Sequence, residues 1–386
     1  MDFAFNDEQL MIQESAAGFL AKASDSAAVR VAMQRPEGFT PEVWQQIAQE
    51  LYWPALMIPE QYGGVGLGFV EQAVLLEQMG RHLLCSPFLA SACLATPALL
   101  LGSNEGLRER WLPELAAGNL TATLAYRQGR EGWHAAPQPK ATRHDQGWQL
   151  DGHFDAVLDG ASAGLLILAS RDETDALLLF AVPADTPGLH SIALPSLDQT
   201  RRLARVVLDA VQVTEAHCLN PVSDGTALLD KALGVGAIAL ACEQVGSAQQ
   251  SLDLTLAYIS ERQQFGRSIA SFQAIKHRCA DLMLAIECAR SASFYAACVA
   301  REALADEGDP LLAGELAEAA HIAKSEASET LMTCAAESIQ LHGGVGFTWE
   351  YDPHLFFKRA RAGEQLLGTP AWHRERLASL ILESRP

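Results

Sequence analysis

The sequence lacks several features that would assign it to a specialised class of protein. None of its eight cysteines forms a Cys-x-x-Cys pair, and no His, Cys and carboxylate residues have convincing metal-ligand spacing. We therefore expect reduced thiols in the core and no metal. No apolar run approaches the ~20 residues of a transmembrane helix, and the first eight residues lack the basic start of a secretory signal. The expectation is a soluble, cytoplasmic protein.

Basic residues are also scarce. The chain has 28 Lys and Arg against 47 Asp and Glu, which gives a formal net charge of -19, and it contains no basic block. Because nucleic acids and anionic membranes carry phosphate charge, we expect neither as the main partner. A nucleotide-like anion would need local positive groups such as Arg262 or helix N-termini.

The pattern of apolar residues divides the chain into three parts. With 386 residues, of which 49% are hydrophobic, the chain exceeds one typical core. Helical periodicity prevails in residues 1–118 and 223–386, and short apolar runs split by turn residues fill residues 119–222. This predicts an α+β protein with an N-terminal helical domain, a middle β-domain and a C-terminal helical domain. The expected helices cover residues 42–51, 69–84, 228–259, 272–304 and 311–341, after one that opens near Asp7; the expected strands cover 165–168, 176–182 and 204–208, with a hairpin edge at 147–152.

Two motifs in the C-terminal part are suited to a phosphate-containing ligand. Arg262 stands at the end of a helical pattern, where a guanidinium can make two charge-assisted bonds to a pyrophosphate, and Phe265 can lie against an adenine. About eighty residues later, Gly343, Gly344 and Gly346 allow backbone amides to approach a phosphate closely. The alternatives are that Arg262 caps the helix, that Phe265 fills core, and that the glycines are an ordinary helix stop.

Together with the Pro59-Glu60…Gly63-Gly64 loop and the stretch at residues 347–354, these motifs resemble the acyl-CoA dehydrogenase family over nearly the whole chain. The resemblance implies a middle β-barrel or sandwich domain and a C-terminal four-helix bundle. It also implies FAD as cofactor, an acyl-CoA substrate, an electron-transfer flavoprotein as electron acceptor, and a homo- or heterotetramer, because neighbouring subunits share the flavin. The residues matching or near FAD-binding positions are Arg262, Gln264, Phe265, Phe272, Gln273, Ile275, Gln340, Gly343, Gly344, Gly346 and Thr369.

The sequence departs from the family where the flavin ring would rest. Family members carry a Thr-Glu-Pro run and later a Trp-Ile-Thr-like strand in the β-domain. Here the corresponding stretches are residues 125–134 and 154–160, which lack the hydroxyl donors expected near the ring. Thr121, Thr123 and Ser162 are alternative sources of a hydroxyl.

The catalytic base is a second departure. The two positions at which family members place the carboxylate hold Leu367 and Gly236, and small residues such as Gly236 would leave room for a bulky acyl group. Glu243 lies seven residues after Gly236, about 10 Å along the same helical face. Its neighbours are apolar, so we expect burial to raise its pKa toward the range of a general base. A Glu bonded at an interface is the alternative; Glu364, near Leu367 on a helix, is a reserve candidate, and Glu350 resembles an interface charge.

Three functional interpretations remain. The first is an active FAD-dependent acyl-CoA dehydrogenase with Glu243 as base, acting on a fatty or sterol side-chain acyl-CoA. The second is a non-catalytic subunit of a heterotetramer that donates the adenine-diphosphate half of the FAD site. Some bacterial two-chain members have such a subunit, and residues 197–202 resemble that group. The third is a flavin-free acyl-CoA-binding or scaffolding protein.

Overall fold

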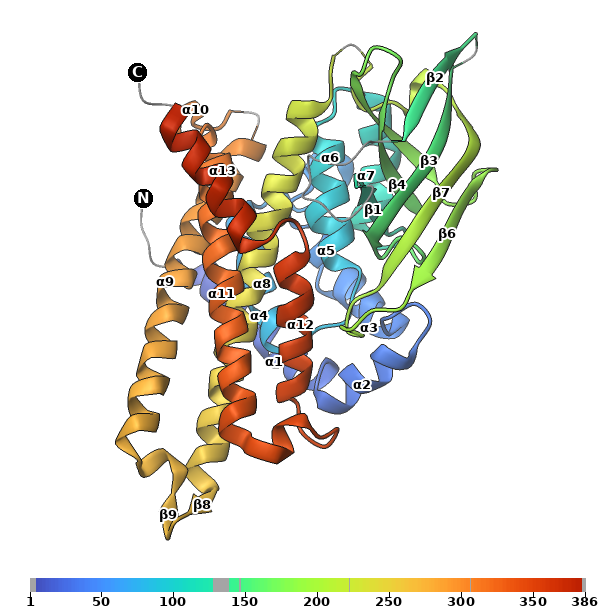
Figure 1. Ribbon diagram of the computed structural model, residues 1–386. Coiled ribbons are helices and arrows are strands. Elements are labelled where there is room, and N and C mark those ends of the chain that lie inside the picture. The colour runs from blue at the N-terminus through green and yellow to red at the C-terminus, as the bar shows by residue number, and fades with distance from the viewer. Residues whose placement is uncertain (1–4, 128–138, 146, 222, 306, 384–386) are drawn as a thin grey trace.

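The computed structural model describes residues 5–127, 139–145, 147–221, 223–305 and 307–383. Helices form both ends of this chain and strands form its middle, so the predicted α+β class is confirmed. Figure 1 shows the curled sheet on one side of the molecule and the long C-terminal helices on the other, with the N-terminal helices between and below them.

The N-terminal helices begin where the sequence supplies caps. Asn6 accepts a hydrogen bond from the backbone N–H of Gln9, and the Gln9 side chain returns the bond, so a capping box opens the first helix. The helices are α1 (Asp7–Ala23), α2 (Ser26–Gln34), α3 (Pro41–Gln45), α4 (Phe69–Arg81), α5 (Phe88–Ala90), α6 (Thr96–Leu101) and α7 (Glu105–Ala116), with π-helical turns η1 (Gln46–Glu50) and η4 (Ser91–Ala95) and 3-10 turns η2 (Trp53–Ala55) and η3 (Glu60–Tyr62).

One seven-stranded sheet follows. Its strand order is β1-β4-β2-β3-β7-β6. Strand β5 lies outside this linear order and pairs with β4. Strand β4 pairs parallel with β1 and antiparallel with β5, and β3 pairs antiparallel with β7 along most of its length. The strands are β1 (Ala122–Ala125), β2 (Lys140–His144), β3 (Gly147–Leu158), β4 (Leu165–Arg171), β5 (Leu177–Pro183), β6 (Leu189–Leu194) and β7 (Leu203–Val213).

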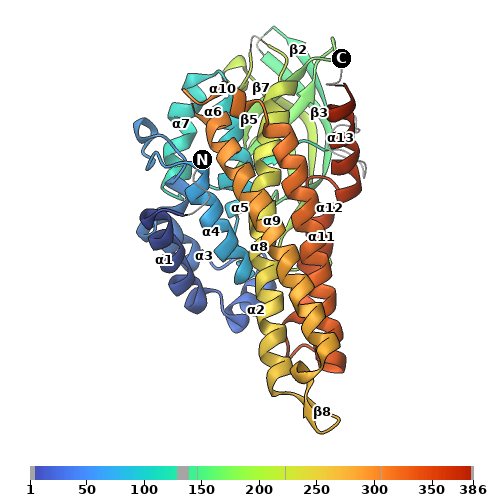
Figure 2. The ribbon, with the colours of Figure 1, turned by 90° about the vertical axis from the view of Figure 1, so that its left-hand side faces the viewer.

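The C-terminal helices pack lengthwise against one another (Figure 2). By length and composition α9 could cross a membrane, but the buried core helices of soluble proteins pass the same test. Here α9 packs against α8 and α11 within the bundle. The helices are α8 (Thr226–Glu261), α9 (Gln273–Leu304), α10 (Pro310–Ala313), α11 (Leu316–His342), α12 (Pro353–Gln365) and α13 (Pro370–Glu383), with 3-10 turns η5 (Glu215–His217), η6 (Ile269–Ser271) and η7 (Gly343–Phe347).

Two glycines allow α4 and α8 to cross at very short range. A Cβ at Gly80 would lie 1.9 Å from the carbonyl oxygen of Glu243, and a Cβ at Gly246 would lie 1.8 Å from that of Glu77. Only glycine fits at such a crossing. The contact fixes the middle of α8 against the N-terminal helices, and the largest apolar core cluster extends from α1 through α8 to the inner face of the sheet.

Most predicted elements are present with shifted ends. The predicted helix at residues 311–341 is divided by the end of α10 at Ala313, and the one at 42–51 continues as the π-helical turn η1. Strand β6 was not predicted, because four of its six side chains are exposed and its sequence does not alternate. All eight cysteines are free, and six of them are buried.

Candidate active site and flavin-binding surface

The first predicted motif forms the tip of the molecule. The two-residue strands β8 (Gln263–Gln264) and β9 (Arg267–Ser268) join α8 to α9 as a hairpin, seen at the lower end of Figure 1. Phe265 and Gly266 form its turn with φ of 55° and 77°. Because the Phe265 side chain is 92% exposed, the alternative that it fills the core is wrong.

Arg262 closes α8 through its backbone but does not use its side chain to do so. Its N–H donates to the carbonyl of Tyr258 at 2.9 Å. Its exposed guanidinium has no ion pair within the described ranges. Gln264 and Gln273 are also exposed, whereas the half-buried Phe272 lies under the guanidinium of Arg267 at 3.9 Å. The half-buried Ile275 belongs to the first turn of α9. The hairpin therefore presents unused cationic and aromatic groups.

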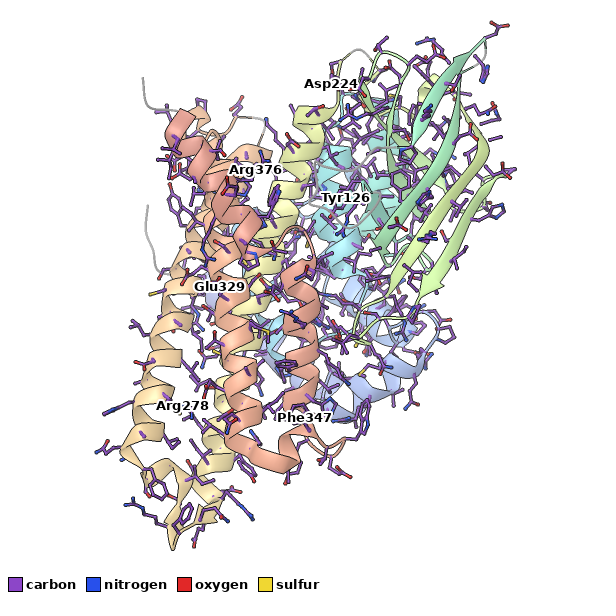
Figure 3. All side chains as sticks on the ribbon, in the orientation of Figure 1. Tyr126, Asp224, Arg278, Glu329, Phe347 and Arg376 are labelled. Carbon is purple, nitrogen blue, oxygen red and sulfur yellow. The ribbon has the colours of Figure 1, made fainter. Side chains whose placement is uncertain are left out.

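The glycine motif lies at the same end of the bundle. Gly343 follows α11 with φ of 65°, and a Cβ at Gly343 or Gly344 would meet nothing within 4 Å. Gly346 is different, because a Cβ there would lie 3.0 Å from a backbone carbonyl. The rings of Tyr258 on α8 and His342 on α11 stack at 4.3 Å, which joins the ends of the two helices. Gln340 is exposed beside this turn, and Figure 3 shows Phe347 and Arg278 at this end.

The hydroxyl groups proposed for the flavin ring are mostly engaged. Thr123 donates to the carbonyl of Leu158 at 2.5 Å, and Ser162 donates to the carbonyl of Asp159 at 3.2 Å. The Thr123 hydroxyl therefore joins β1 to the end of β3, and the Ser162 hydroxyl closes the turn between β3 and β4. Thr121 is half-buried before β1, and residues 128–134 of the altered stretch lie outside the described ranges. Tyr126, which Figure 3 labels near the edge between sheet and helices, is buried, and burial raises its pKa to about 12.

The two positions at which the family places its base converge in space. A Cβ at Gly236 would lie 3.5 Å from Cδ1 of Leu367 and 2.2 Å from Cδ2 of Leu94. Leu94 and Leu367 are each 1% exposed. The sequence predicted free space beside the small residue at position 236. This prediction is wrong, because the Leu94 side chain fills that space.

Glu243 is an ion-pair residue and not a group with a raised pKa. Arg201 contacts both of its carboxylate oxygens, and Arg359 contacts one. Burial alone would raise the pKa of Glu243, but the two guanidinium groups outweigh burial and hold the pKa below its usual value. The expectation of a raised pKa is therefore wrong, because sequence spacing could not reveal arginines from the β6–β7 connection and from α12.

The arginines are themselves held by a wider buried cluster. Arg359 donates from Nε to the hydroxyl of Thr200 at 2.7 Å and lies 3.4 Å from the carboxylate of Asp198. The Thr200 N–H donates to Asp198 at 2.9 Å. The ion pairs of this cluster therefore join two guanidinium groups, those of Arg201 and Arg359, to two carboxylates. The carboxylates are those of Asp198 and Glu243, so the formal charges of the four groups sum to zero. Arg201 Nη1 and Asp198 Oδ2 make no hydrogen bond within the described ranges, but each carboxylate lies beside a guanidinium group, as is typical of a structural ion-pair cluster.

A different carboxylate has the raised pKa that was expected of Glu243. Asp159 follows β3 with φ of 52° and is 7% exposed. Burial raises its pKa to about 7, although Arg201, Arg202 and Arg359 oppose the shift. In the sequence, Asp159 stands out only as part of the altered stretch 154–160. Its signal was an acidic residue between apolar strand residues and a Gly turn.

The remaining candidates serve local structure. Glu364 forms an ion pair with Arg361 at 2.5 Å. The sequence predicted that Glu364 and Leu367 share a helix. This is wrong, because α12 ends at Gln365. Glu350 is exposed. The Thr369 hydroxyl accepts a hydrogen bond from the Trp372 N–H at 3.2 Å, so it also caps α13.

The turn that carries Leu367 is clamped from below. Leu367 has φ of 58°, and its carbonyl accepts a hydrogen bond from Nε2 of His373 at 2.9 Å. Nζ of the fully buried Lys324 donates to the carbonyls of Gly363 and Gly368, each at 3.1 Å. Burial lowers the pKa of Lys324 to about 7 and that of His373 to about 3. The clamp holds the Leu367 side chain over Gly236.

Sequence comparisons agree with this geometry. The acyl-CoA dehydrogenase N-terminal and C-terminal domain models match residues 6–119 and 223–382. The chain is 35% identical to acyl-CoA dehydrogenase IpdE2 of Mycobacterium tuberculosis over 98% of both chains. The chain belongs to the acyl-CoA dehydrogenase family.

Solved structures of the family share its fold. A variant of the Tcur3481-Tcur3483 steroid ACAD is 28% identical with a TM-score of 0.86, over 98% of both chains. An acyl-CoA dehydrogenase of Bacillus anthracis complexed with FAD has a TM-score of 0.89 at 22% identity, over 98% of this chain and 67% of that one. FAD is the cofactor of this acyl-CoA dehydrogenase-family chain.

The described residues fit one half of FAD better than the other. The adenine-diphosphate half is suited to an exposed aromatic ring at Phe265, a guanidinium without an ion pair at Arg262, and open backbone at Gly343 and Gly344. At the ring half, the hydroxyls of Thr123 and Ser162 already donate hydrogen bonds to backbone carbonyls, that of Thr123 to Leu158. They therefore offer no free donor to the flavin ring. The assignment of individual FAD contacts remains a prediction.

Proposed function

We propose that this chain is the non-catalytic subunit of a heterotetrameric acyl-CoA dehydrogenase in the cytoplasm, and that it contributes the adenine-diphosphate half of a FAD site shared with its partner. One observation carries the proposal. Gly236 and Leu367, which stand at the two positions of the family's base, face each other across a space that Leu94 fills. Neither residue can accept a proton.

The state of Glu243 supports the same conclusion. A general base needs a free lone pair and a pKa near the working pH. The carboxylate of Glu243 is bound by Arg201 and Arg359, and its pKa is lowered. We infer that Glu243 joins α8, α12 and the β6–β7 connection and does not remove a proton from substrate.

The chemistry divides accordingly between the cofactor and two chains. FAD, when bound, accepts the hydride removed from the acyl-CoA, and an electron-transfer flavoprotein is the proposed electron acceptor. In this chain, Arg262 would bind the pyrophosphate and Phe265 would cover the adenine. The partner would supply the carboxylate that removes the α-proton. We propose a fatty or sterol side-chain acyl-CoA as substrate, since the Tcur3481-Tcur3483 relative is named a steroid ACAD.

The test is the flavin content and turnover of the chain purified alone and after co-expression with a related dehydrogenase subunit. We expect little flavin and no dye-linked turnover alone, and about one FAD per shared site with turnover in the mixed assembly. Loss of turnover should follow mutation of the partner's carboxylate but not Glu243→Gln, provided that the variant still assembles. One FAD per chain that an acyl-CoA bleaches in the isolated protein would refute the proposal.

A self-sufficient acyl-CoA dehydrogenase is the second candidate, and Asp159 is the observation that favours it. Asp159 belongs to the stretch 154–160, which corresponds to the family's strand near the flavin ring; its carboxyl is buried, and burial raises its pKa to about 7. A base with that pKa would be half-ionised near neutral pH. In this case Asp159→Asn should abolish turnover by the isolated chain while flavin stays bound. Retained turnover would exclude Asp159 as the base.

A further inference from the structure

A pocket separate from the flavin-binding surface lies between α4, α8 and α9, which Figure 2 shows side by side. Its volume is about 310 Å³. Apolar side chains, among them Val74 and Val245, form its walls. At one side the rings of Phe5 and Phe294 meet edge to face at 5.3 Å. This volume is about twice that of the ~150 Å³ apolar cavity known to bind benzene.

One polar group in the wall has no partner. Ser293 is 3% exposed, and its hydroxyl makes no hydrogen bond within the part of the chain that the structure describes. Ser291, two residues before Ser293, also lines the wall. Its hydroxyl donates a hydrogen bond to the carbonyl of Glu287 at 2.9 Å and is therefore satisfied. A buried unpaired hydroxyl costs free energy that a hydrogen bond to a ligand oxygen would recover.

The rim of the pocket is charged but already neutralised in part. Arg290 forms ion pairs with Glu77 at 3.2 Å and with Glu287, and it donates to Gln249 at 3.0 Å. The rim therefore holds two carboxylates and one engaged guanidinium, which disfavours an anion such as a carboxylate or a CoA phosphate. Among the rim residues that the structure describes, no cationic group is left to attract such a ligand.

We propose that this pocket binds an uncharged, mainly apolar small molecule with one oxygen that accepts a hydrogen bond from the Ser293 hydroxyl. The apolar walls supply most of the affinity, and the single hydroxyl fixes the orientation, as is usual for small-molecule sites. The site is independent of FAD and of the proposed division of catalysis, because none of its lining residues belongs to either motif.

Two probes that differ by one hydroxyl test this assignment. Binding of 2-naphthol and naphthalene is measured by fluorescence titration and calorimetry on the full-length protein in the assembly in which it purifies. We expect one site per chain and tighter binding of 2-naphthol. Ser293→Ala should weaken 2-naphthol about fivefold and leave naphthalene unchanged, which corresponds to the net value of one hydrogen bond. Ser291→Ala, the matched control, should change neither affinity.

A filling substitution checks the location. Ala73→Leu places three more carbons at the wall and should reduce binding of both probes at least tenfold. If this variant does not fold, the Ser293→Ala comparison decides alone, because that change removes only one atom. Absence of saturable binding by either probe would overturn the proposal. Equal affinities in the wild type and Ser293→Ala for 2-naphthol would overturn it as well.

Discussion

Glu243 on α8 and Arg359 on α12 form an ion pair whose side chains are only 7% and 3% exposed. Arg201 binds the same carboxylate from the β6–β7 connection. Three segments distant in the sequence therefore meet at one buried acid. Removing one member of such a pair leaves charge in the interior without a counterion, which costs far more than the pair contributes.

Glu243→Gln should therefore lower stability strongly. We expect a loss of about 3 kcal/mol in the free energy of unfolding, since two buried guanidinium groups lose their carboxylate. Urea unfolding measures it. Glu329→Gln removes an exposed partner of Arg374 and serves as control, with an expected change below about 1 kcal/mol. Equal stability of the two variants would show that the buried cluster does not stabilise the fold.

Asp159→Asn should change the pH dependence of stability. The pKa of Asp159 is raised by burial from 3.8 to about 7 in the folded protein. A raised folded pKa gives stability that is fully present below pH 3.8 and lost as pH rises through 7. The wild type should therefore lose stability relative to Asp159→Asn between about pH 4 and 8, by up to roughly 1.4 kcal/mol per pH unit. Unfolding at pH 5 and pH 8 compares the two proteins, and a constant difference would contradict the raised pKa.

Arg262→Ala should reduce FAD retention. A guanidinium–phosphate hydrogen bond is worth about 1.5–3 kcal/mol, so the FAD dissociation constant of the assembled protein should rise roughly 10- to 100-fold. Flavin absorbance after gel filtration gives the occupancy. Arg376→Ala on α13, at the opposite end of the bundle in Figure 3, is the matched control. Full occupancy after Arg262→Ala would remove this residue from the site.

Leu367→Glu should be destabilising in a pH-dependent manner. The new carboxyl would face Leu94 and the backbone at Gly236, where burial raises its pKa. The variant should lose several kcal/mol at pH 8 and less at pH 5, where the group can be protonated. Leu367→Met keeps the side chain apolar and should cost under about 1.5 kcal/mol at both pH values. Thermal unfolding at the two pH values is the measurement, and a pH-independent loss would mean that the group reaches solvent.

The amino-acid sequence determined much of the fold, because local patterns carry it. Helical periodicity located α4, α8 and α9 within a few residues, and apolar runs located β4 and β5. The motifs around Arg262 and Gly343 also predict one shared ligand from the sequence alone. Their meeting at one end of the bundle follows from two long helices that run side by side and end together.

Only the tertiary structure decided the electrostatics of the interior. Glu243 and Asp159 are both acidic residues among apolar neighbours in the sequence, yet one pKa is lowered and the other raised. The difference depends on how closely Arg201 and Arg359 approach each carboxylate, and those arginines are 42 and 116 residues from Glu243 along the chain. Periodicity records which face of an element is apolar. It does not record which charge from a distant segment will be buried against that face, and at this site that charge decides whether burial raises the pKa of a carboxyl or an ion pair lowers it.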